Sequence, residues 1–342
     1  MTAALPGLPL ALPVIAAPMA GGPGTPALAI AAARAGALGF VAGGYLTPSA
    51  LAADVATVTA AGVPFGVNLF APNPIPIDAA AYARYAALLA PEASRLGVAL
   101  PTAPQEDDDG WPAKVAVLRE RPVPLISFTF GLPPATDLTL LRATGAVLAQ
   151  TVTSVPEAQA AAAAGIDVLV VQSAAAGGHS GTFTPDRPVP ALPLADLVAV
   201  VRSAVRLPVV AAGGVGTAAD VTAALSAGAS LVAVGTALLR ASEVGTTPAH
   251  RAALTDPART TTVVTRAFTG RPARGLRNTF TDRYSDAAPL GYPALHHLTR
   301  PIRRAAAATN DPDHLHLWAG TAFHHASDDP VATILARLSS TA

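Results

Sequence analysis

His179 is the residue in this sequence whose type and surroundings point most clearly to chemistry. It is the only histidine among the first 249 residues, and it lies beside Gly177, Gly178 and Gly181. Imidazole is the one side chain whose ordinary pKa makes it change charge near neutral pH, so a lone histidine on a glycine-rich loop is a candidate general base. The competing interpretation is a histidine that only caps a turn. The flanking glycines favour the base.

Two further glycine clusters follow apolar runs and precede helical segments. Gly213 and Gly214 end the run that begins near Val209, and Gly235 with Thr236 ends the next one. Glycines at such turns let backbone N–H groups approach a phosphate, and the following helix N-terminus favours its negative charge. Ordinary turns are the alternative. We reject a dinucleotide site of the G-x-G-x-x-A type, because no acidic ribose partner stands about 20 residues further on.

A third group of residues has the side chains that would bind a flat, neutral ring. Ala17, Pro18 and Met19 end the first apolar run, and Asn68 and Gln172 lie near the ends of two others. Side-chain amides offer both donors and acceptors, as the edge of a flavin pyrimidine requires, and a methionine thioether packs softly against a ring. Each residue alone would more simply fill the core or satisfy backbone groups. Together with a phosphate site they favour a phosphorylated ring cofactor.

The elements that must position these residues repeat along the chain as a small-residue helix, a glycine and an apolar run. Glycine is favoured just past a helix because it adopts a left-handed conformation without a Cβ clash. The stop glycines are Gly36, Gly62, Gly145, Gly165 and Gly228. Continuous apolar runs are typical of parallel strands that are covered on both faces. Eight strands are predicted, beginning near Val14, Leu38, Phe65, Val123, Val147, Val168, Val209 and Leu231.

This alternation predicts an α/β fold, a (β/α)8 TIM barrel, with a doubly wound sheet as the alternative. Two segments do not fit the repeat: a proline-rich and acidic insertion after the third strand, and the tail. We expect residues 1–70 and 116–254 to form the barrel. Residues 71–115 and 255–342 are expected to form a small, mostly helical lid over the C-terminal mouth, where barrel enzymes place their sites.

Composition narrows the class of protein. The 342 residues include 22 basic and 22 acidic side chains, a formal net charge of zero, and no cysteine. A thiolate nucleophile and a Cys-ligated metal are therefore excluded, and a nucleic-acid partner is disfavoured. No uninterrupted apolar stretch is long enough for a membrane-spanning helix, which needs about 20 residues. We expect a cytoplasmic enzyme, monomeric or homodimeric, whose N-terminal segment leads into the first strand.

A series of motifs in order along the chain resembles the nitronate monooxygenases, formerly called 2-nitropropane dioxygenases. The motifs are APMAGG, VNLF at 67–70, SFTFGLP at 127–133, VVQ with AGGHSG at 170–181, AAGGV at 211–215, GT at 235–236, GRPARGLRN at 270–278, YP at 292 and LWAG at 317. The glycine pairs alone occur in other flavin barrels. AGGHSG together with GRPARGLRN is more specific.

The resemblance implies flavin mononucleotide (FMN) as the cofactor. Its phosphate would lie at the two glycine turns, 213–214 and 235–236, and its ring near Met19, Asn68, Gln172 and the glycines at 177–178. His179 falls on the family's catalytic histidine, as the base for a neutral nitroalkane or the cation that orients a nitronate. O2 would complete the oxidation to a carbonyl compound and nitrite. Relatives commonly carry a glutamate in the loop before this histidine, where this chain has Ala175, and an asparagine near the tail's Tyr-Pro, where it has His296.

Two alternatives stay open. One is an NAD(P)H-dependent flavin reductase of the enoyl-acyl-carrier-protein reductase or quinone reductase type, and the other is a barrel that binds a phosphate ligand without redox chemistry. No metal site is expected, because the remaining histidines, such as the pairs 296–297 and 324–325, lack carboxylates at ligand spacing and suit the surface. Arginines 266, 271, 274 and 277 are expected to pair with carboxylates and fasten the tail to the barrel, with contact to a phosphate as the alternative.

Overall fold

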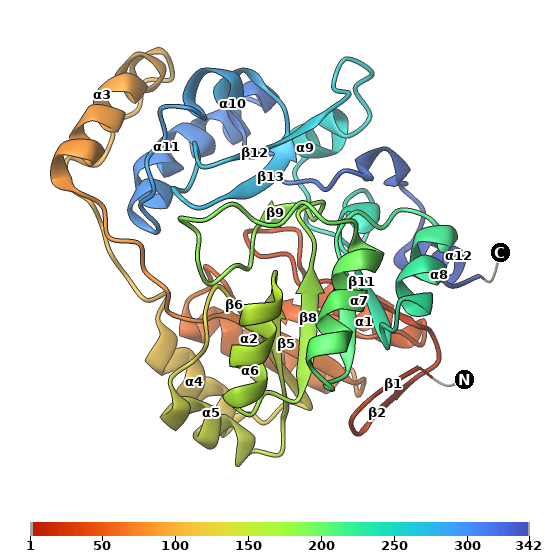
Figure 1. The fold of residues 1–342 in the computed structure, drawn as a ribbon. Helices are drawn as coiled ribbons and strands as arrows, with labels where there is room; N and C mark the ends of the chain where they lie inside the picture. Colours follow the sequence, from red (N-terminus) through yellow and green to blue (C-terminus); the bar gives the residue numbers. More distant parts are fainter. Residues whose placement is uncertain (1–2, 341–342) are drawn as a thin grey trace.

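Eight parallel strands form a closed barrel, which confirms the predicted fold class (Figure 1). A computed structural model describes residues 3–340. Each strand pairs with its neighbour, and a parallel bridge between Ile15 and Leu38 closes the barrel from the first strand to the second. The strands are β3 (Val14–Ala16), β4 (Gly39–Ala42), β5 (Phe65–Phe70), β6 (Leu125–Thr129), β7 (Val147–Val152), β8 (Val168–Gln172), β10 (Val209–Ala212) and β11 (Leu231–Val234).

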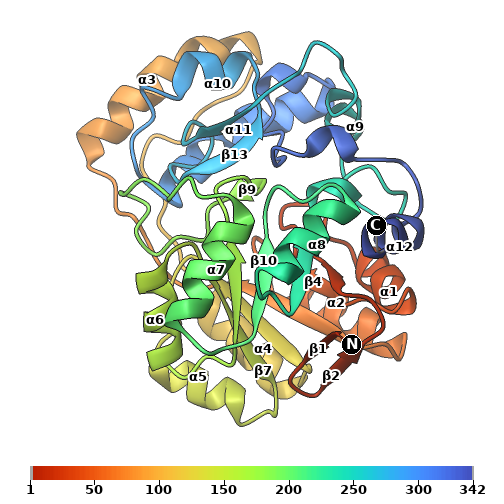
Figure 2. The same ribbon diagram turned by 45° about the vertical axis from the view of Figure 1, so that its right-hand side comes forward.

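Helices between the strands cover the barrel on the outside (Figure 2). They are α1 (Pro26–Arg34), α2 (Pro48–Ala60), α4 (Trp111–Glu120), α5 (Ala135–Arg142), α6 (Val155–Ala163), α7 (Leu194–Ala204), α8 (Ala218–Ser226) and α12 (Val331–Ser339). Thr25, Thr47, Ser154 and Thr217 each cap a helix by accepting a hydrogen bond from a backbone N–H of its first turn. All five stop glycines adopt positive φ, between 67° and 104°, as expected for helix ends.

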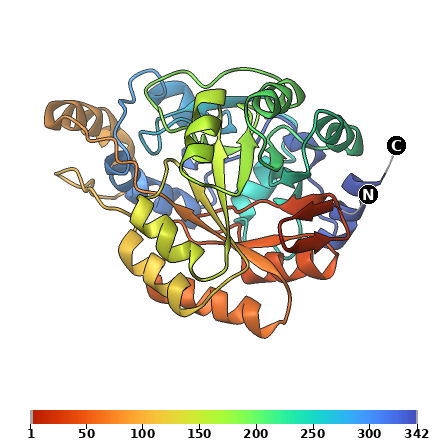
Figure 3. The same ribbon diagram turned by 60° about the horizontal axis from the view of Figure 1, so that its bottom comes forward.

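The N-terminal residues form a hairpin rather than only a lead-in to the first strand. β1 (Ala3–Leu5) and β2 (Leu8–Leu10) pair antiparallel at the end of the barrel away from the lid (Figures 1 and 3). Leu5, Leu8 and Leu10 pack onto the apolar side chains of the barrel interior, including Phe40 and Leu231. The hairpin therefore plugs the bottom of the barrel and leaves the other end for a ligand.

Both segments outside the repeat lie over the opposite end of the barrel (Figure 2). α3 (Ala79–Arg95) belongs to the insertion, and α10 (Thr279–Tyr284) and α11 (Ala294–Ala308) to the tail. Tyr85 and Leu89 of α3 share an apolar core with Leu295 and Leu298 of α11. Segments that are far apart in the sequence therefore fold as one layer.

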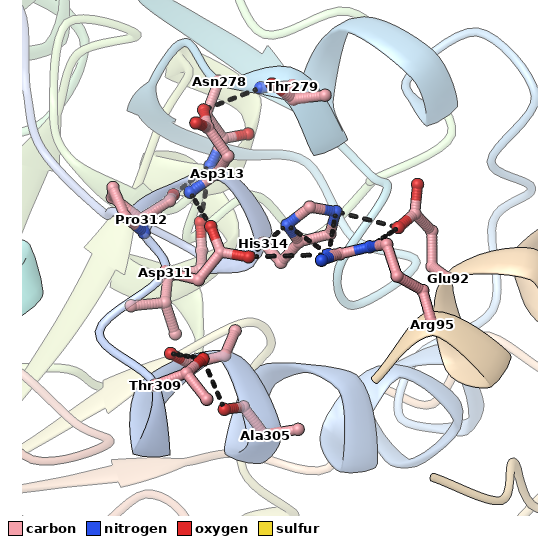
Figure 4. Close-up of polar contacts among 12 residues, drawn as sticks. Glu92, Arg95, Asn278, Thr279, Ala305, Thr309, Asp311, Pro312, Asp313 and His314 are labelled. Carbon is pink, nitrogen blue, oxygen red and sulfur yellow. Dashed lines mark hydrogen bonds and ion pairs between the residues drawn. The ribbon is translucent and has the colours of Figure 1, made fainter. Parts of the chain in front are cut away.

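A polar cluster fastens α3 to the short helix η2 (Pro312–His314) of the tail (Figure 4). Glu92, whose side chain is only 4% exposed, lies 3.0 Å from His314 Nε2, and Asp311 lies 2.8 Å from Nδ1 of the same ring. Arg95 contacts Glu92 at 3.1 Å, and Arg283 contacts it at 2.6 Å. The pKa of Glu92 is lowered: its arginine and histidine partners outweigh burial, which acts in the opposite direction and is the largest single effect.

The lid is not purely helical, and its edges differ from the expected ranges. β12 (Thr262–Thr265), β13 (Ala273–Leu276) and β9 (Gly178–His179) form a small antiparallel sheet. α4 begins inside the range 71–115, yet it packs between α2 and α5 of the barrel, and α12 at the end of the tail packs on α1 and α8. The division of the chain into two domains stays a prediction. Among residues 3–340, no helix is both long and apolar enough to cross a membrane.

Candidate active site

One cavity of about 810 Å³ lies between the C-terminal ends of the strands and the lid. All twelve residues singled out in the sequence line it. They are Ala17, Pro18, Met19, Asn68, Gln172, Gly177, Gly178, His179, Gly213, Gly214, Gly235 and Thr236. The topology explains why, since the carboxyl ends of parallel strands in a barrel meet at one face. Their separate roles stay predictions.

The turns after β10 and β11 form a cradle with little side-chain bulk. Gly213 has φ +110°, and a Cβ on it would stand 2.7 Å from Ser173 Oγ and 2.9 Å from the Ala176 amide nitrogen. Within the described residues, the amide N–H groups of Gly213, Gly214 and Gly235 have no hydrogen-bond acceptor. Free amide N–H groups at the wall of a cavity can donate to a bound anion, so this cradle suits a group such as a phosphate.

Asn68 and Gln172, the two predicted ring contacts, already make hydrogen bonds within the protein. Asn68 Nδ2 donates to Ser127 Oγ at 2.9 Å, and this bond does not use the side-chain oxygen of Asn68. Gln172 Nε2 donates to the His179 carbonyl at 3.2 Å, and its Oε1 accepts from the Gly181 amide at 2.7 Å. Gln172 therefore fixes the backbone that follows the candidate base.

The imidazole of His179 is held by the lid, although its backbone belongs to the loop after β8. His179 pairs with Ala273 in the small sheet, and its Nε2 lies 2.9 Å from Thr269 Oγ1. Rings of Phe130, Tyr292 and Trp318 approach its edges and face, with centroids 5.7, 6.0 and 5.4 Å away. The ring is thus confined on several sides at the cavity wall.

Burial at this wall, together with the smaller effect of the positive charges of Arg271 and Arg303, lowers the pKa of His179 from 6.5 to about 3. The imidazole is therefore neutral at neutral pH. Arg271 is fully buried, with its guanidinium 4.1 Å from the Phe130 ring centroid, and it donates to the carbonyls of Phe130 and Thr182. Burial lowers the pKa of Arg271 to about 10, so it stays cationic. Arg271 itself does not line the cavity, whereas Arg303 does.

Several cavity residues were not anticipated from the sequence. His296 stacks on Tyr45 with ring centroids 4.4 Å apart, and Arg303 donates to the His296 carbonyl at 2.7 Å. Burial raises the pKa of Tyr45 to about 12, and its hydroxyl accepts from Tyr292 at 3.4 Å. Tyr292 follows directly from the YP motif, so a signal existed for it. Nothing in the sequence places Tyr45 beside α11, which lies near the other end of the chain.

The expected surface positions of the remaining histidines are wrong for several of them. His250 is 8% exposed and lines the cavity. His314 is 6% exposed and belongs to the polar cluster of Figure 4, while His296 and His316 line the cavity. Folding of the tail onto the barrel buries them, and burial lowers the pKa of His296 and His316 well below 6.5. His324 is exposed, as expected.

Of the four arginines expected to pair with carboxylates, only Arg277 does so among residues 3–340, and Arg266, Arg271 and Arg274 form no ion pair there. Arg277 pairs with Asp282 at 2.7 Å. Arg271 instead donates to backbone carbonyls, and Arg274 donates to the Ala174 carbonyl at 2.7 Å. Loops present carbonyls at these positions, and a planar guanidinium reaches several of them at once.

Comparison with known proteins agrees with this geometry. The family model described as nitronate monooxygenase matches residues 4–340. The chain belongs to the nitronate monooxygenase family. A nitronate monooxygenase of Paraburkholderia phytofirmans is 34% identical, with 98% of this chain and 93% of the relative covered. The family assignment makes the protein an oxidoreductase.

Solved structures place the whole chain beside two enzymes. Nitroalkane oxidase from Streptomyces ansochromogenes superposes with a TM-score of 0.90 and 42% identity, covering 96% of this chain and 95% of that one. FabK from Thermotoga maritima is more distant, with a TM-score of 0.73 and 25% identity over 96% of this chain and 92% of that one. Both similarities support the barrel fold.

Proposed function

We propose that the cavity binds FMN and that the enzyme oxidises alkyl nitronates with O2 to carbonyl compounds and nitrite, His179 serving as base when the substrate is a neutral nitroalkane. The observation that carries this proposal is the neutral imidazole of His179 at the wall of a cavity that also contains an unpaired amide cradle. Membership of the nitronate monooxygenase family supports the substrate class.

The residues present fit FMN. Gly213, Gly214, Gly235 and Thr236 would hold the phosphate through backbone N–H groups, and Asn68 with Met19 would contact the ring. A cavity of about 810 Å³ is within the usual range for cofactor sites. Bound there, FMN would supply the two-electron chemistry that connects the nitronate to O2.

The structure favours a base over an orienting cation at position 179. A histidine whose pKa is about 3 has a free ring nitrogen at neutral pH and carries no charge. Positive charge comes instead from Arg271 and Arg303, which are both buried and remain protonated. Proton removal from a nitroalkane creates an anion, and these cations stabilise it.

Cofactor and product analysis tests the proposal. We expect the purified enzyme to release stoichiometric FMN on denaturation and to form nitrite from a small alkyl nitronate in air without NAD(P)H. His179→Asn should keep its FMN and lose about 10² to 10⁴-fold in kcat/KM with a neutral nitroalkane. A colourless protein would favour the non-redox alternative, and nitrite formation that requires NADPH would favour the reductase.

A further inference from the structure

We propose that Thr269 is a positioning residue that sets the tautomer of His179, so that Nε2 carries the ring proton and Nδ1 accepts the proton of a neutral nitroalkane. This inference rests on the proposed function. Thr269 precedes the GRPARGLRN segment and comes from the lid, 90 residues after the histidine.

The hydroxyl of Thr269 is held where it can act on the ring. Thr269 is 1% exposed, and its amide donates to the Arg266 carbonyl at 3.2 Å. The following Gly270 adopts φ +75°, and its carbonyl accepts from the Gly291 amide at 3.1 Å. A Cβ on Gly270 would stand 2.5 Å from the Gly291 carbonyl oxygen, so only glycine permits this close approach. The turn is therefore fixed on both sides of Thr269.

Hydrogen-bond counting assigns the proton. Thr269 Oγ1 has three neighbours: His179 Nε2 at 2.9 Å, the Arg271 carbonyl at 3.3 Å and the Arg271 amide at 3.4 Å. A carbonyl only accepts and an amide only donates, whereas the imidazole nitrogen can do either. If the hydroxyl proton points to the Arg271 carbonyl, all three contacts are satisfied only when His179 Nε2 carries a proton.

The opposite tautomer leaves a buried acceptor unpaired. If the hydroxyl donates to Nε2, the Arg271 carbonyl loses Thr269, which is its only hydrogen-bond donor among the described residues. Arg271 is fully buried, so no water replaces that donor without cost. The Nε2–H tautomer is therefore the stable one, and it leaves a lone pair on Nδ1.

No other described residue can set the tautomer in place of Thr269. Gln172 bonds to His179 only at its backbone carbonyl and not at its ring. Phe130, Tyr292 and Trp318 contact the ring through their aromatic faces and edges, and none of them hydrogen-bonds to it. Packing thus fixes the position of the ring, and Thr269 alone distinguishes its two nitrogens.

Proton transfer from the nitroalkane to His179 accounts for every bond and charge. The α-carbon C–H bond of the nitroalkane breaks, its proton moves to Nδ1, and its electron pair moves onto the nitro group to give the nitronate anion. His179 becomes an imidazolium that still donates from Nε2 to Thr269. Arg303 lines the cavity in which the new negative charge forms, and Arg271 adds positive charge from behind the cavity wall. A nitronate supplied as such needs no proton removal, so it reports on the site without this step.

Matched substitutions separate this role from a structural one. Thr269→Val keeps the shape and removes the hydroxyl, and Thr269→Ser keeps the hydroxyl. We expect Thr269→Val to lower the ratio of kcat/KM for a nitroalkane to kcat/KM for its nitronate by about tenfold or more, as part of the effect of a general base. Thr269→Ser should restore most of that ratio. Thr265→Val, which removes a buried hydroxyl that contacts Ser285 instead, should leave the ratio unchanged.

An equal loss with both substrates, or a serine variant as impaired as the valine variant, would overturn the proposal. A measurement on the unaltered holoenzyme decides the case if the valine variant does not fold. Nitrogen NMR of the histidine rings, with His179→Asn for assignment, should show His179 protonated at Nε2; protonation at Nδ1 would refute the inference. Because this readout needs no substrate, it is independent of whether the wild-type enzyme oxidises nitronates.

Discussion

Burial and neighbouring cations leave His179 neutral over most of the pH range in which enzymes work. Its pKa of about 3 lies well below the 6.5 of an exposed histidine. A lowered pKa keeps the neutral base available at more acid pH. Activity should therefore be lost only at a lower pH. The same cations that weaken the base stabilise the nitronate that it produces.

This predicts the pH dependence of nitroalkane turnover. We expect kcat/KM with a neutral nitroalkane to stay nearly constant from about pH 7 to about pH 5, because kcat/KM reports the pKa of the free enzyme's base. Steady-state rates of nitrite formation across this range provide the measurement. A decline with an apparent pKa near 6.5 would show that His179 titrates like an exposed histidine.

Among individual residues, the sequence predicted those cavity residues that lie in glycine-rich turns at the ends of strands. His179, Gly213 and Gly235 were found because each follows an apolar run that ends at the same face of the barrel. Thr269 and Arg271 were not found as site residues, because they reach His179 only through the pairing of β9 with β13. Antiparallel pairing between a barrel loop and a distant tail has no local sequence signature.

At the element scale, the turn after β10 is predicted to be specific for the cofactor. Gly213→Ala should weaken FMN binding by about tenfold or more, because the new Cβ would clash with Ser173 Oγ and a neighbouring amide. Gly62→Ala is the matched control: φ is +67° there, and a Cβ meets nothing within 4 Å. Fluorescence titration of the apoprotein with FMN measures both. Equal effects of the two substitutions would mean that backbone strain, rather than the cradle, limits binding.

The attachment of α3 depends on the buried carboxylate of Glu92. Glu92→Gln should lower the free energy of unfolding by about 2 to 3 kcal/mol, because Arg95, Arg283 and His314 lose their shared charged acceptor. Urea denaturation measures the change. Asp329→Asn removes the exposed partner of Arg337 and should cost clearly less. If both substitutions had the same effect, the polar cluster would not be what secures α3.

The elements themselves were largely predictable, and their edges were not. Helix-stop glycines and apolar runs located all eight barrel strands. The exceptions are α4 and α12. The expected boundary at residue 115 falls inside α4, and α12 was placed in the lid because the strand–helix repeat stops after about residue 254. Each packs on barrel helices because its apolar face matches theirs, as Val331, Ile334 and Leu335 of α12 show by joining the barrel core. A composition shift marks where a pattern changes, whereas packing decides which core a helix joins.

For the whole molecule, folding the tail over the barrel leaves several histidines uncharged. The pKa of His250 is lowered to about 4 by burial, and those of His179, His296 and His316 are also below 6.5. Below about pH 6.5 the unfolded chain therefore binds protons that the native state does not. The free energy of unfolding therefore falls as the pH falls, by up to about 1.4 kcal/mol per pH unit for each such histidine.

We accordingly predict a decrease in the free energy of unfolding between pH 7 and pH 5. His250→Asn should make this pH dependence shallower, and substitution of the exposed His324 should not change it. Urea titrations at several pH values test this. Stability that is constant over that range would show that these histidines are protonated equally in the folded and unfolded chain.

We propose that this cavity uses a flavin to oxidise a nitronate without a nicotinamide donor. Anaerobic mixing of the purified enzyme with a small alkyl nitronate, followed by flavin absorbance near its visible maximum, tests it most directly. We predict rapid bleaching by the nitronate, no bleaching by NADPH and recovery of the oxidised spectrum when air is admitted. A spectrum unchanged by several nitronates, together with rapid bleaching by NADPH, would contradict the account.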